Sequence, residues 1–314
     1  MKILFIGNTR LGDAILSTCI LNYYKDKNIN ISVVCSPLSR NIYKNFTTVK
    51  KIIAVNKKKR GKHWLEVYYD LERVRWDLVI DLRNSIISRL VRKKKVLRLG
   101  KSNPDEHRVE SLCKLININN IIIPSIPITS NIKNKAFKII SDEKIVFPIL
   151  AIAPITNWQR KNWPINNFAL LINKLLQSKV KNSFKCIIII GSKNEKKQCD
   201  YLVKKIKNIH ILNLCGAYDI SIIYALLKHC SLFIGNDSGL MHLSAAANIN
   251  TLGLFGPSKE VNYRPWGKKS YSLRTKIDYE KLVNVEGYSR HDTSSLMKSL
   301  TVERVFQKCL DIIK

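Results

Sequence analysis

Short apolar runs alternate with helical patterns along the first half of this chain. Ile3–Ile6 forms the first run and ends at Gly7, and Gly12–Tyr24 then repeats apolar residues at the spacing of a helix. The same pattern predicts strands over Ile31–Cys35 and Val79–Leu82 and a helix over Ser85–Val91. Continuous apolar strands separated by helices are typical of a doubly wound parallel sheet, so we predict an α/β fold.

The pattern breaks between about Ile121 and Phe147, where prolines stand in a mixed polar sequence typical of a linker. Beyond this break, the predicted strands are Leu150–Ala153, Cys186–Ile190, Leu232–Ile234 and Thr251–Phe255, and the predicted helices are Asn166–Leu176, Ser221–His229, Leu240–Ala247 and Thr301–Ile313. We therefore predict two α/β domains, residues 1–145 and 146–314, with the ligand in a cleft between them. The terminal helix, residues 301–314, is a candidate to pack back on the first domain.

The length of the chain is consistent with two domains, and its net charge does not identify a binding partner. The chain has 314 residues, which suits two domains of about 150 residues each. Its net charge is +31, and such a charge attracts nucleic acids, anionic lipid headgroups and nucleotide phosphates. The chain is also rich in Lys, Asn and Ile, as an AT-rich coding sequence would produce, so the charge alone identifies no partner. We expect the basic runs Lys57–Arg60 and Arg92–Lys95 to lie on solvated faces.

The eight cysteines and the apolar runs indicate the cellular compartment of the protein. No C-x-x-C pair and no zinc-like spacing occurs, and most of the cysteines stand in apolar segments, which suits a reducing cytosol. No apolar run approaches the roughly 20 residues that span a bilayer. Arg10 and Asp13 interrupt the run that starts at Met1, so we interpret this run as a strand rather than a signal peptide. We predict a cytoplasmic protein whose contact with a membrane is peripheral.

The turn after the first predicted strand, Gly7–Asp13, reads G-N-T-R-L-G-D. Its two glycines allow a tight turn and the close approach of a ligand to the backbone. Asp13 stands where a Walker A loop has its lysine, and no G-x-G-x-x-G is present. Asp13 either caps the following helix, whose N-terminus favours a negative charge, or acts as a general base directed into the cleft.

Three later loops also follow predicted strands. Residues 153–164 contain Arg160 and Lys161, and such a loop either binds a pyrophosphate or is a surface segment anchored by Trp163. Residues 235–246 read G-N-D-S-G-L-M-H-L-S-A-A, which brings a hydroxyl and open backbone N–H groups to a helix N-terminus. That arrangement suits a phosphate or a sugar hydroxyl, and the alternative is an N-cap with a core histidine. Residues 254–258, L-F-G-P-S, form a strand end and a turn.

The order of these motifs (G-D, K-x-W-P, G-x-x-x-E, N-D-S-G-L-M-H and L-F-G-P-S) resembles the lipopolysaccharide heptosyltransferases of glycosyltransferase family 9. The resemblance runs from the first strand to about Trp266, and its most specific part is N-D-S-G-L-M-H with G-P-S. It implies the GT-B fold, in which two Rossmann-like domains hold the active site between them. It also implies an inverting enzyme that uses ADP-heptose and needs no metal.

The resemblance also implies roles for individual residues. Asp13 matches the proposed catalytic base, and Lys161 matches the lysine that holds the donor phosphates. The implied donor-binding residues are Thr156, Glu195 at the ribose, and Asp237, Ser238, Gly239 and His242 at the sugar and phosphates.

The first half of the chain contains the implied acceptor region. Asp81–Ser85 is similar to the family's strand end that faces the acceptor, and Asp105–Arg108 resembles the helix start that completes this region. The arginines expected to meet acidic groups of the acceptor are Arg83, Arg89 and Arg108; the alternative for each is an exposed arginine on a solvated face.

Taken together, the resemblance implies transfer of heptose from ADP-heptose to a lipopolysaccharide core or a related glycolipid. The nucleotide sugar is then a substrate, no cofactor is expected, and an anionic membrane surface is an expected partner. The alternatives are a family member that uses another nucleotide sugar and a non-catalytic basic protein that binds nucleotides or nucleic acid. No nucleic-acid reading module is present, and the missing G-x-G-x-x-G disfavours a nicotinamide-dependent oxidoreductase.

Overall fold

The computed structural model describes residues 1–56, 61, 63–101, 103–178, 184–285, 288–289 and 291–313. The chain forms two compact units, Met1–Thr129 and Ser130–Lys314, called here the N-terminal and the C-terminal unit. The division therefore falls before residue 130, whereas the proline-rich break predicted a boundary between residues 145 and 146. The basic run Lys57–Arg60 lies outside the described residues.

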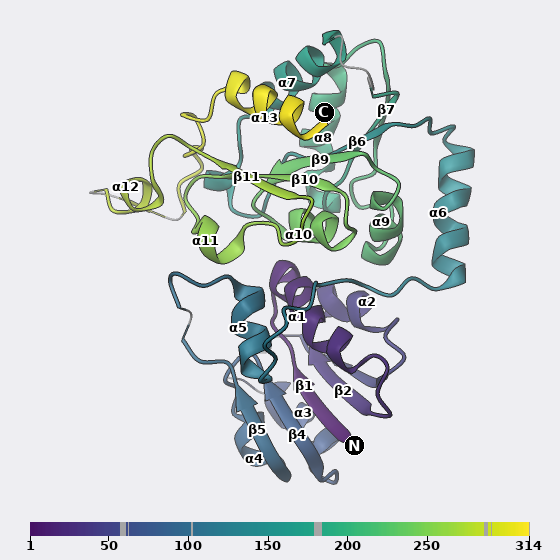
Figure 1. The fold of residues 1–314 in the computed structure, drawn as a ribbon, viewed down its shortest axis with the longest axis vertical. Coiled ribbons are helices and arrows are strands. Elements are labelled where there is room, and N and C mark those ends of the chain that lie inside the picture. Colours follow the sequence, from purple (N-terminus) through teal and green to yellow (C-terminus); the bar gives the residue numbers. More distant parts are fainter. Residues whose placement is uncertain are drawn as a thin grey trace. The chain divides into compact units, whose positions relative to one another are not determined.

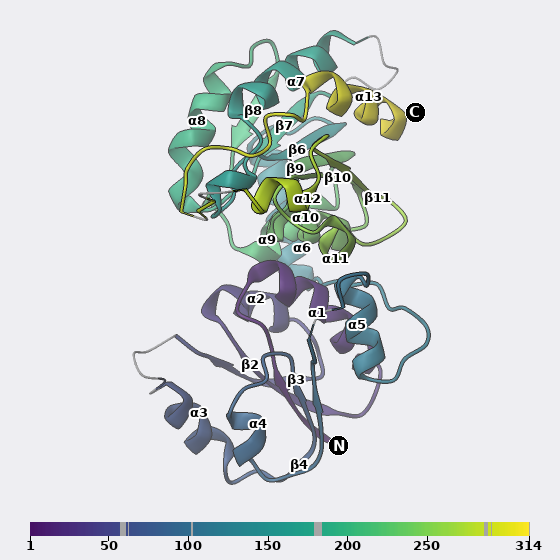
Figure 2. The same cartoon turned by 90° about the vertical axis from the view of Figure 1, so that its left-hand side faces the viewer.

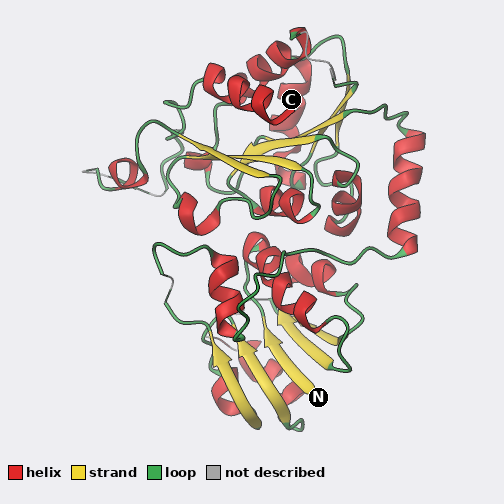
Figure 3. Cartoon of the chain, in the orientation of Figure 1, coloured by secondary structure: helices red, strands yellow, loops and turns green. Residues whose placement is uncertain are grey.

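The N-terminal unit contains a parallel sheet with the strand order β3-β2-β1-β4-β5 (Figures 1 and 3). Its strands are β1 (Lys2–Ile6), β2 (Asn30–Cys35), β3 (Val49–Ala54), β4 (Trp76–Asp81) and β5 (Lys93–Arg98). Its helices are α1 (Leu11–Tyr24), η1 (Pro37–Ser39), α2 (Arg40–Tyr43), α3 (His63–Leu71), α4 (Ile87–Leu90) and α5 (Arg108–Leu115). Helices α1, α2 and α5 cover one face of the sheet, and α3 and α4 cover the other (Figure 2).

Alternating side chains of the central strands supply the cores of both faces. Leu4 and Ile6 of β1 join Val67 of α3 and Ile87 of α4 in one buried cluster. Phe5 points the other way and packs edge-on against Tyr43 of α2, with ring centroids 6.0 Å apart. The predicted doubly wound arrangement is confirmed for this unit.

The basic run Arg92–Lys95 forms regular structure that the sequence pattern did not predict. Its lysines begin β5, which pairs with β4 from Trp76 opposite Lys93 to Asp81 opposite Arg98. This strand is at the edge of the sheet, where exposed lysines discourage pairing with another chain. Lys94 and Lys95 are solvent-exposed, as expected of a solvated face.

The C-terminal unit contains a second parallel sheet, with the strand order β11-β10-β9-β6-β7-β8. Its strands are β6 (Ile149–Ala153), β7 (Cys186–Ile189), β8 (His210–Asn213), β9 (Leu232–Asn236), β10 (Asn250–Phe255) and β11 (Ser270–Arg274). Its helices are α6 (Ser130–Asp142), η3 (Gln159–Lys161), α7 (Ile165–Gln177), η4 (Lys193–Glu195), α8 (Lys196–Lys204), α9 (Ile220–Leu227), α10 (Gly239–Ala246), α11 (Glu260–Tyr263), α12 (Tyr279–Val283) and α13 (Val302–Ile313).

Helix α6 corrects the interpretation of residues 121–147 as a linker. This helix buries Ile132, Ala136 and Ile139 and packs against α9 of the same unit. The apolar positions are spaced as one helix face, but the Asn and Lys residues between them lower the average hydrophobicity of the segment. The polar composition therefore concealed a helix that belongs to the C-terminal core.

The terminal helix α13 also belongs to the C-terminal core. It packs against α7, and it buries Val305, Phe306 and Cys309 in a cluster with Trp163. The sequence suggested the first domain as its support, whereas the apolar face of α13 is used within its own unit. All eight cysteines are buried, and none forms a disulfide.

Candidate active site

Each sheet reverses its strand order at one point, and the predicted motifs gather at these two points. The reversal lies between β1 and β4 in the N-terminal unit and between β6 and β9 in the C-terminal unit. Ligands of open parallel sheets bind beyond the carboxyl ends of the strands at such positions. The turn that leads to Asp13 follows β1, the loop 154–164 follows β6, and Asp237 directly follows β9.

Asn236 joins the two central loops of the C-terminal unit. Its side chain is fully buried, donates to the Pro154 carbonyl at 2.7 Å, and accepts the Trp163 N–H at 3.0 Å. One amide therefore fixes the end of β9 against both ends of the loop 154–164. Asn236 lies inside the N-D-S-G motif, yet the sequence reasoning gave it no role.

Lys161 and Asp237 form a shielded ion pair at this junction. The Lys161 ammonium group contacts the Asp237 carboxylate, and only 21% and 8% of the two side chains are exposed. The same ammonium group lies 5.5 Å from the centroid of the Trp158 ring. The structure thus brings together two residues that the sequence assigned to one site, although 76 positions separate them.

Thr156 organises the loop that contains Lys161. Its N–H and its hydroxyl both donate to the Asn162 side-chain oxygen, at 2.8 and 2.9 Å, and the hydroxyl also lies 3.0 Å from the Trp158 carbonyl. These bonds set the shape of the turn between β6 and η3. Thr156 therefore has a structural role, and it can contact a phosphate only if its hydroxyl exchanges these partners.

Three more predicted donor-binding residues, Ser238, Gly239 and His242, lie at or near the N-terminus of α10. Ser238 is the N-cap and Gly239 the first helical residue. The Ser238 hydroxyl oxygen is inaccessible to solvent and has no hydrogen-bond partner among the described residues. His242, one turn later, is buried in the same helix. An unsatisfied hydroxyl at a positive helix end is well suited to an anionic oxygen.

Glu195 lies at the carboxyl end of β7, at the start of α8. One of its carboxylate oxygens accepts the Ser192 N–H at 2.7 Å in a capping box. Burial raises the pKa of the Glu195 carboxyl, while the hydrogen bonds from Ser192 act in the opposite direction. Its structural role is therefore helix capping, and among the described residues no contact joins it to Lys161 or Asp237.

Close backbone packing at the end of β9 depends on Gly235. A Cβ atom there would lie 2.7 Å from the Phe233 ring and 2.9 Å from the Ala153 carbonyl oxygen of β6. We expect Gly235→Ala to lower the free energy of unfolding by about 1–3 kcal/mol, because the two strands must shift apart. Gly100→Ala is the matched control, since a Cβ at Gly100 meets nothing within 4 Å. Denaturant unfolding of both variants measures the difference, and equal losses would contradict the packing argument.

Arg160, which precedes Lys161, connects the Lys161 loop to Ser289 and Asp292, a contact that the sequence did not predict. Arg160 is buried, donates to the Ser289 carbonyl, and pairs with Asp292 at 3.1 Å. Its guanidinium also lies 4.7 Å from the centroid of the Tyr288 ring. Because the partners are more than 120 residues away in sequence, spacing alone gave no signal of this role.

Asp13 and Arg108 come together in the N-terminal unit. Asp13 lies in the first turn of α1, and its carboxylate is 3.8 Å from Arg108 Nε at the start of α5. Only 14% and 15% of these side chains are exposed. His107 and Glu110 form a capping box at the N-terminus of α5. This capping box makes Arg108 the first residue of the helix and so fixes its position. Arg108 was predicted as an acceptor residue, and the structure adds Asp13 as its partner.

Arg83 and Arg89 have other neighbours. Asp81 is fully buried and accepts the backbone N–H groups of Arg83 at 2.9 Å and Ser85 at 2.6 Å, which shapes the turn after β4. The Arg83 guanidinium lies 5.0 Å from the centroid of the Trp64 ring, and burial lowers its pKa. Arg89 is exposed on α4 and donates to Asn84 at 3.2 Å.

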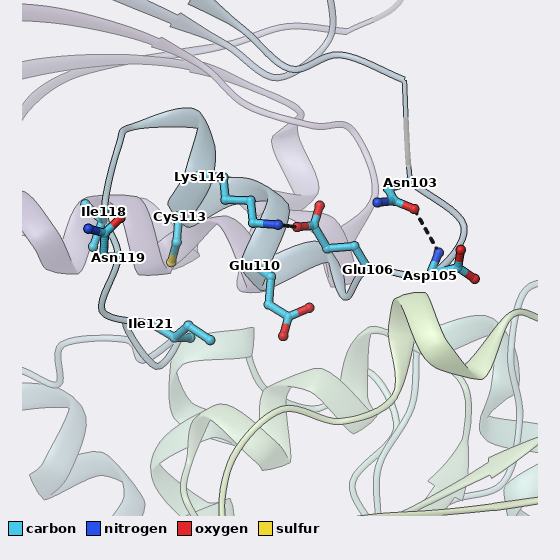
Figure 4. Close-up of a pocket in the computed structure, with 9 residues that line it drawn as sticks. All are labelled: Asn103, Asp105, Glu106, Glu110, Cys113, Lys114, Ile118, Asn119 and Ile121. Atoms are coloured by element: carbon cyan, nitrogen blue, oxygen red, sulfur yellow. Dashed lines mark hydrogen bonds and ion pairs between the residues drawn. The ribbon is translucent and has the colours of Figure 1, made fainter.

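A pocket of about 430 Å³ opens along α5 (Figure 4). It is lined by Asn103, Asp105, Glu106, Glu110, Cys113, Lys114, Ile118, Asn119 and Ile121. Lys114 contacts Glu106, which lowers the pKa of that carboxyl, so the cation of this pocket is already neutralised. An acidic lining is a poor match for the acidic acceptor groups expected from sequence. The Asp105–Arg108 motif therefore supplies Arg108 to the Asp13 pair, while its acidic residues face this pocket.

Neither a metal centre nor a spanning helix is found in the described part of the chain. These residues contain no group of three or more His, Cys, Asp or Glu side chains placed to hold a metal ion. None of the described helices combines the length and the apolar character needed to cross a membrane.

The fold is of the GT-B type, with two Rossmann-like units that each contain a parallel sheet. Known structures share this fold. The fold matches that of a glycosyl transferase family 9 protein from Veillonella parvula, with a TM-score of 0.81, 18% identity, and coverage of 99% of this chain and 97% of that one. It also matches ADP-heptose lps heptosyltransferase II of E. coli, with a TM-score of 0.76, 17% identity, and coverage of 100% and 98%.

Sequence comparison then gives the family. The model of glycosyltransferase family 9 (heptosyltransferase) matches residues 64–288, so the chain belongs to this family and is a glycosyltransferase. Lipooligosaccharide heptosyltransferase 2 of Campylobacter jejuni is 28% identical over an alignment of 330 positions, which covers 100% of this chain and 99% of that protein. The family resemblance predicted from the motifs is thereby confirmed.

A more distant structural match bears on metal content. The bacterial iron-containing dodecameric glycosyltransferase TibC from E. coli shares the fold at a TM-score of 0.56 and 12% identity, with coverage of 99% of this chain and 78% of that one. One protein with this fold therefore contains iron, and the metal-free reaction implied by sequence stays a prediction.

Proposed function

We propose that this protein transfers heptose from ADP-heptose to a sugar hydroxyl of a lipooligosaccharide or lipopolysaccharide core, with inversion at the anomeric carbon and without a metal. The observation that carries the proposal is the Lys161–Asp237 pair beside the unsatisfied Ser238 hydroxyl at the N-terminus of α10. The names of the full-length Campylobacter relative and of the E. coli structural match support heptose as the sugar.

The donor diphosphate is assigned to the C-terminal unit. Lys161 offers a positive charge next to the first turn of α10, where backbone N–H groups and the helix dipole also favour an anion. When the diphosphate binds, Lys161 exchanges Asp237 for phosphate oxygens. Asp237 is then available to accept hydrogen bonds from hydroxyl groups of the donor sugar.

The acceptor and the base are assigned to the N-terminal unit. The acceptor hydroxyl oxygen forms a bond to the anomeric carbon while the bond from that carbon to the phosphate oxygen breaks. Asp13 takes the hydroxyl proton, and the electron pair of the broken bond leaves with ADP. Attack opposite the leaving group inverts the anomeric centre. Lys161 stabilises the charge that develops on the departing diphosphate, and such stabilisation is commonly the largest single catalytic contribution.

Arg108 is proposed to hold Asp13 in its reactive orientation. The 3.8 Å pair lies where α1 and α5 begin, and both side chains are largely shielded from water. Arg83, whose half-buried guanidinium stacks on Trp64, is the better placed of the remaining two arginines for an acidic acceptor group.

A thermal-shift titration with ADP, UDP, GDP, CDP and NAD tests the donor assignment. Ligand at 100 times its dissociation constant adds about 2.7 kcal/mol of stability, which raises the melting temperature by several degrees. We expect ADP to give the largest shift, and we expect it with EDTA present throughout, because the proposed site uses the Lys161 ammonium group in place of a metal ion.

The other outcomes are equally specific. A larger shift with UDP, GDP or CDP would keep the transferase and replace the heptose donor. A shift with ADP that EDTA abolishes would contradict the metal-free reaction. No shift with any nucleoside diphosphate would contradict the donor site itself.

A further inference from the structure

Helix α3 exposes two large apolar side chains on the side that faces away from its core. His63, Val67 and Leu71 are its buried residues. Leu65 and Tyr69 are 61% and 68% exposed. Each residue turns a helix by about 100°, so Leu65 and Tyr69 point opposite to the buried stripe. These two side chains contribute little to the core of the unit.

The neighbouring helix α4 repeats this feature. Ile86, which precedes it, and Leu90, its last residue, are 47% and 56% exposed, and they are four positions apart. Ile87 between them is fully buried. Helices α3 and α4 contact each other and cover the same face of the sheet over a shared core (Figure 2). We call Leu65, Tyr69, Ile86 and Leu90 the α3–α4 apolar surface.

Cations flank this surface. Arg89 lies between Ile86 and Leu90 and is solvent-exposed, and Arg73 and Arg92 are exposed directly after α3 and α4. Acidic groups also lie nearby: Glu66 is exposed on α3 and Glu72 is half-buried directly after it, while Asp70 lies 3.3 Å from Lys51 and Asp77 lies 2.7 Å from Lys94. Exposed apolar groups with flanking arginines match the boundary between acyl chains and headgroups of an anionic bilayer.

We propose that the α3–α4 apolar surface docks this protein on an anionic lipid bilayer, with Leu65, Tyr69, Ile86 and Leu90 inserted at the headgroup level and Arg89 on lipid phosphates. This inference rests on the proposed function, since a glycolipid acceptor is held in a membrane. It gives Arg89 a different ligand from the acceptor group that the sequence suggested. The arginines favour lipid over a second protein copy, which an apolar surface alone would also suit.

Vesicle cosedimentation of the full chain tests this docking. The vesicles contain phosphatidylethanolamine with phosphatidylglycerol, or phosphatidylcholine alone. We expect binding only to the phosphatidylglycerol vesicles, and we expect the double variant Leu65→Ser/Leu90→Ser to bind them at least about tenfold more weakly. Leu170→Ser is the matched control, because Leu170 is a 58% exposed leucine on α7 of the C-terminal unit, and its binding should equal that of the wild type.

Two further readouts separate docking from catalysis. The double variant should keep the wild-type ADP thermal shift and the wild-type rate on a water-soluble, deacylated acceptor, and it should lose activity only on acceptor in vesicles. Undiminished vesicle binding by the double variant, or no binding by the wild type, would overturn the docking surface while the ADP titration still judges the donor site. A changed oligomeric state of the double variant with unchanged vesicle binding would replace the bilayer with a second copy.

Discussion

Replacing Asp13 with asparagine is expected to slow sugar transfer by about 10²–10⁴-fold, the usual contribution of a positioned general base. Asparagine keeps the shape of the side chain and its place in the first turn of α1, but it cannot accept the proton of the acceptor hydroxyl. The helix loses one favourable charge near its N-terminus, which costs less than about 1 kcal/mol, and the shielded Arg108 guanidinium also loses the charge of its partner. Initial rates on a soluble acceptor, compared with the ADP thermal shift of the same variant, measure the effect.

The donor residues lie in the other unit, so ADP binding by Asp13→Asn should match the wild type. Asp77→Asn is the matched control, because Asp77 is a half-buried aspartate of the N-terminal unit with an ion-pair partner, Lys94, and no proposed catalytic role. Turnover by Asp13→Asn near the wild-type rate would remove Asp13 as the base.

The kinetics of an Arg108 variant distinguish two roles for this residue, orienting Asp13 and binding the acceptor. A residue that orients Asp13 lowers kcat when it is lost, whereas a residue that only binds the acceptor raises KM. The contact with Asp13 at 3.8 Å leads us to expect a lower kcat in Arg108→Gln with a smaller change in KM. A purely raised KM would return Arg108 to the acceptor role that the sequence suggested.

The sequence predicted the strands of the two sheet centres because they are apolar on both faces. Ile3–Ile6 and Leu150–Ala153 were placed within one residue of β1 and β6, and the motifs at their carboxyl ends follow from that placement. Elements whose polar residues outnumber their apolar ones were missed. Strand β5 starts with three lysines, and helix α6 buries three residues, Ile132, Ala136 and Ile139.

The sequence suggested which residues form the candidate site, but it did not give the contacts among them. Lys161 and Asp237 were both assigned to donor binding, but their direct pairing requires β6 and β9 to be neighbours, which only the strand order reveals. Arg108 and Asp13 likewise meet because α5 returns to the face covered by α1. A motif specifies the chemistry of a loop, while the topology decides which loops touch.

Replacing Lys161 with alanine is expected to lower kcat/KM by about 10²–10³-fold, the range found when one preorganised charge-stabilising contact is removed. The variant should also bind ADP more weakly, for two reasons. It loses the cation that faces the diphosphate, and it leaves the Asp237 carboxylate, 8% exposed, without that partner at a site that must accept an anion. Transfer rates and the ADP thermal shift are measured on the same preparation.

A second substitution, at Asp237, tests whether charge repulsion contributes to the weaker binding of ADP. If like-charge repulsion contributes to the loss, the double variant Lys161→Ala/Asp237→Asn should bind ADP more tightly than Lys161→Ala alone, because the remaining buried charge is removed. Lys174→Ala is the matched control: Lys174 pairs with Glu303 on the surface of the same unit, where such a pair contributes at most about 1 kcal/mol. Its ADP shift should equal that of the wild type. An unchanged ADP shift in Lys161→Ala would mean that the diphosphate binds elsewhere, and the Lys161–Asp237 pair would then be part of the scaffold that joins β6 to β9.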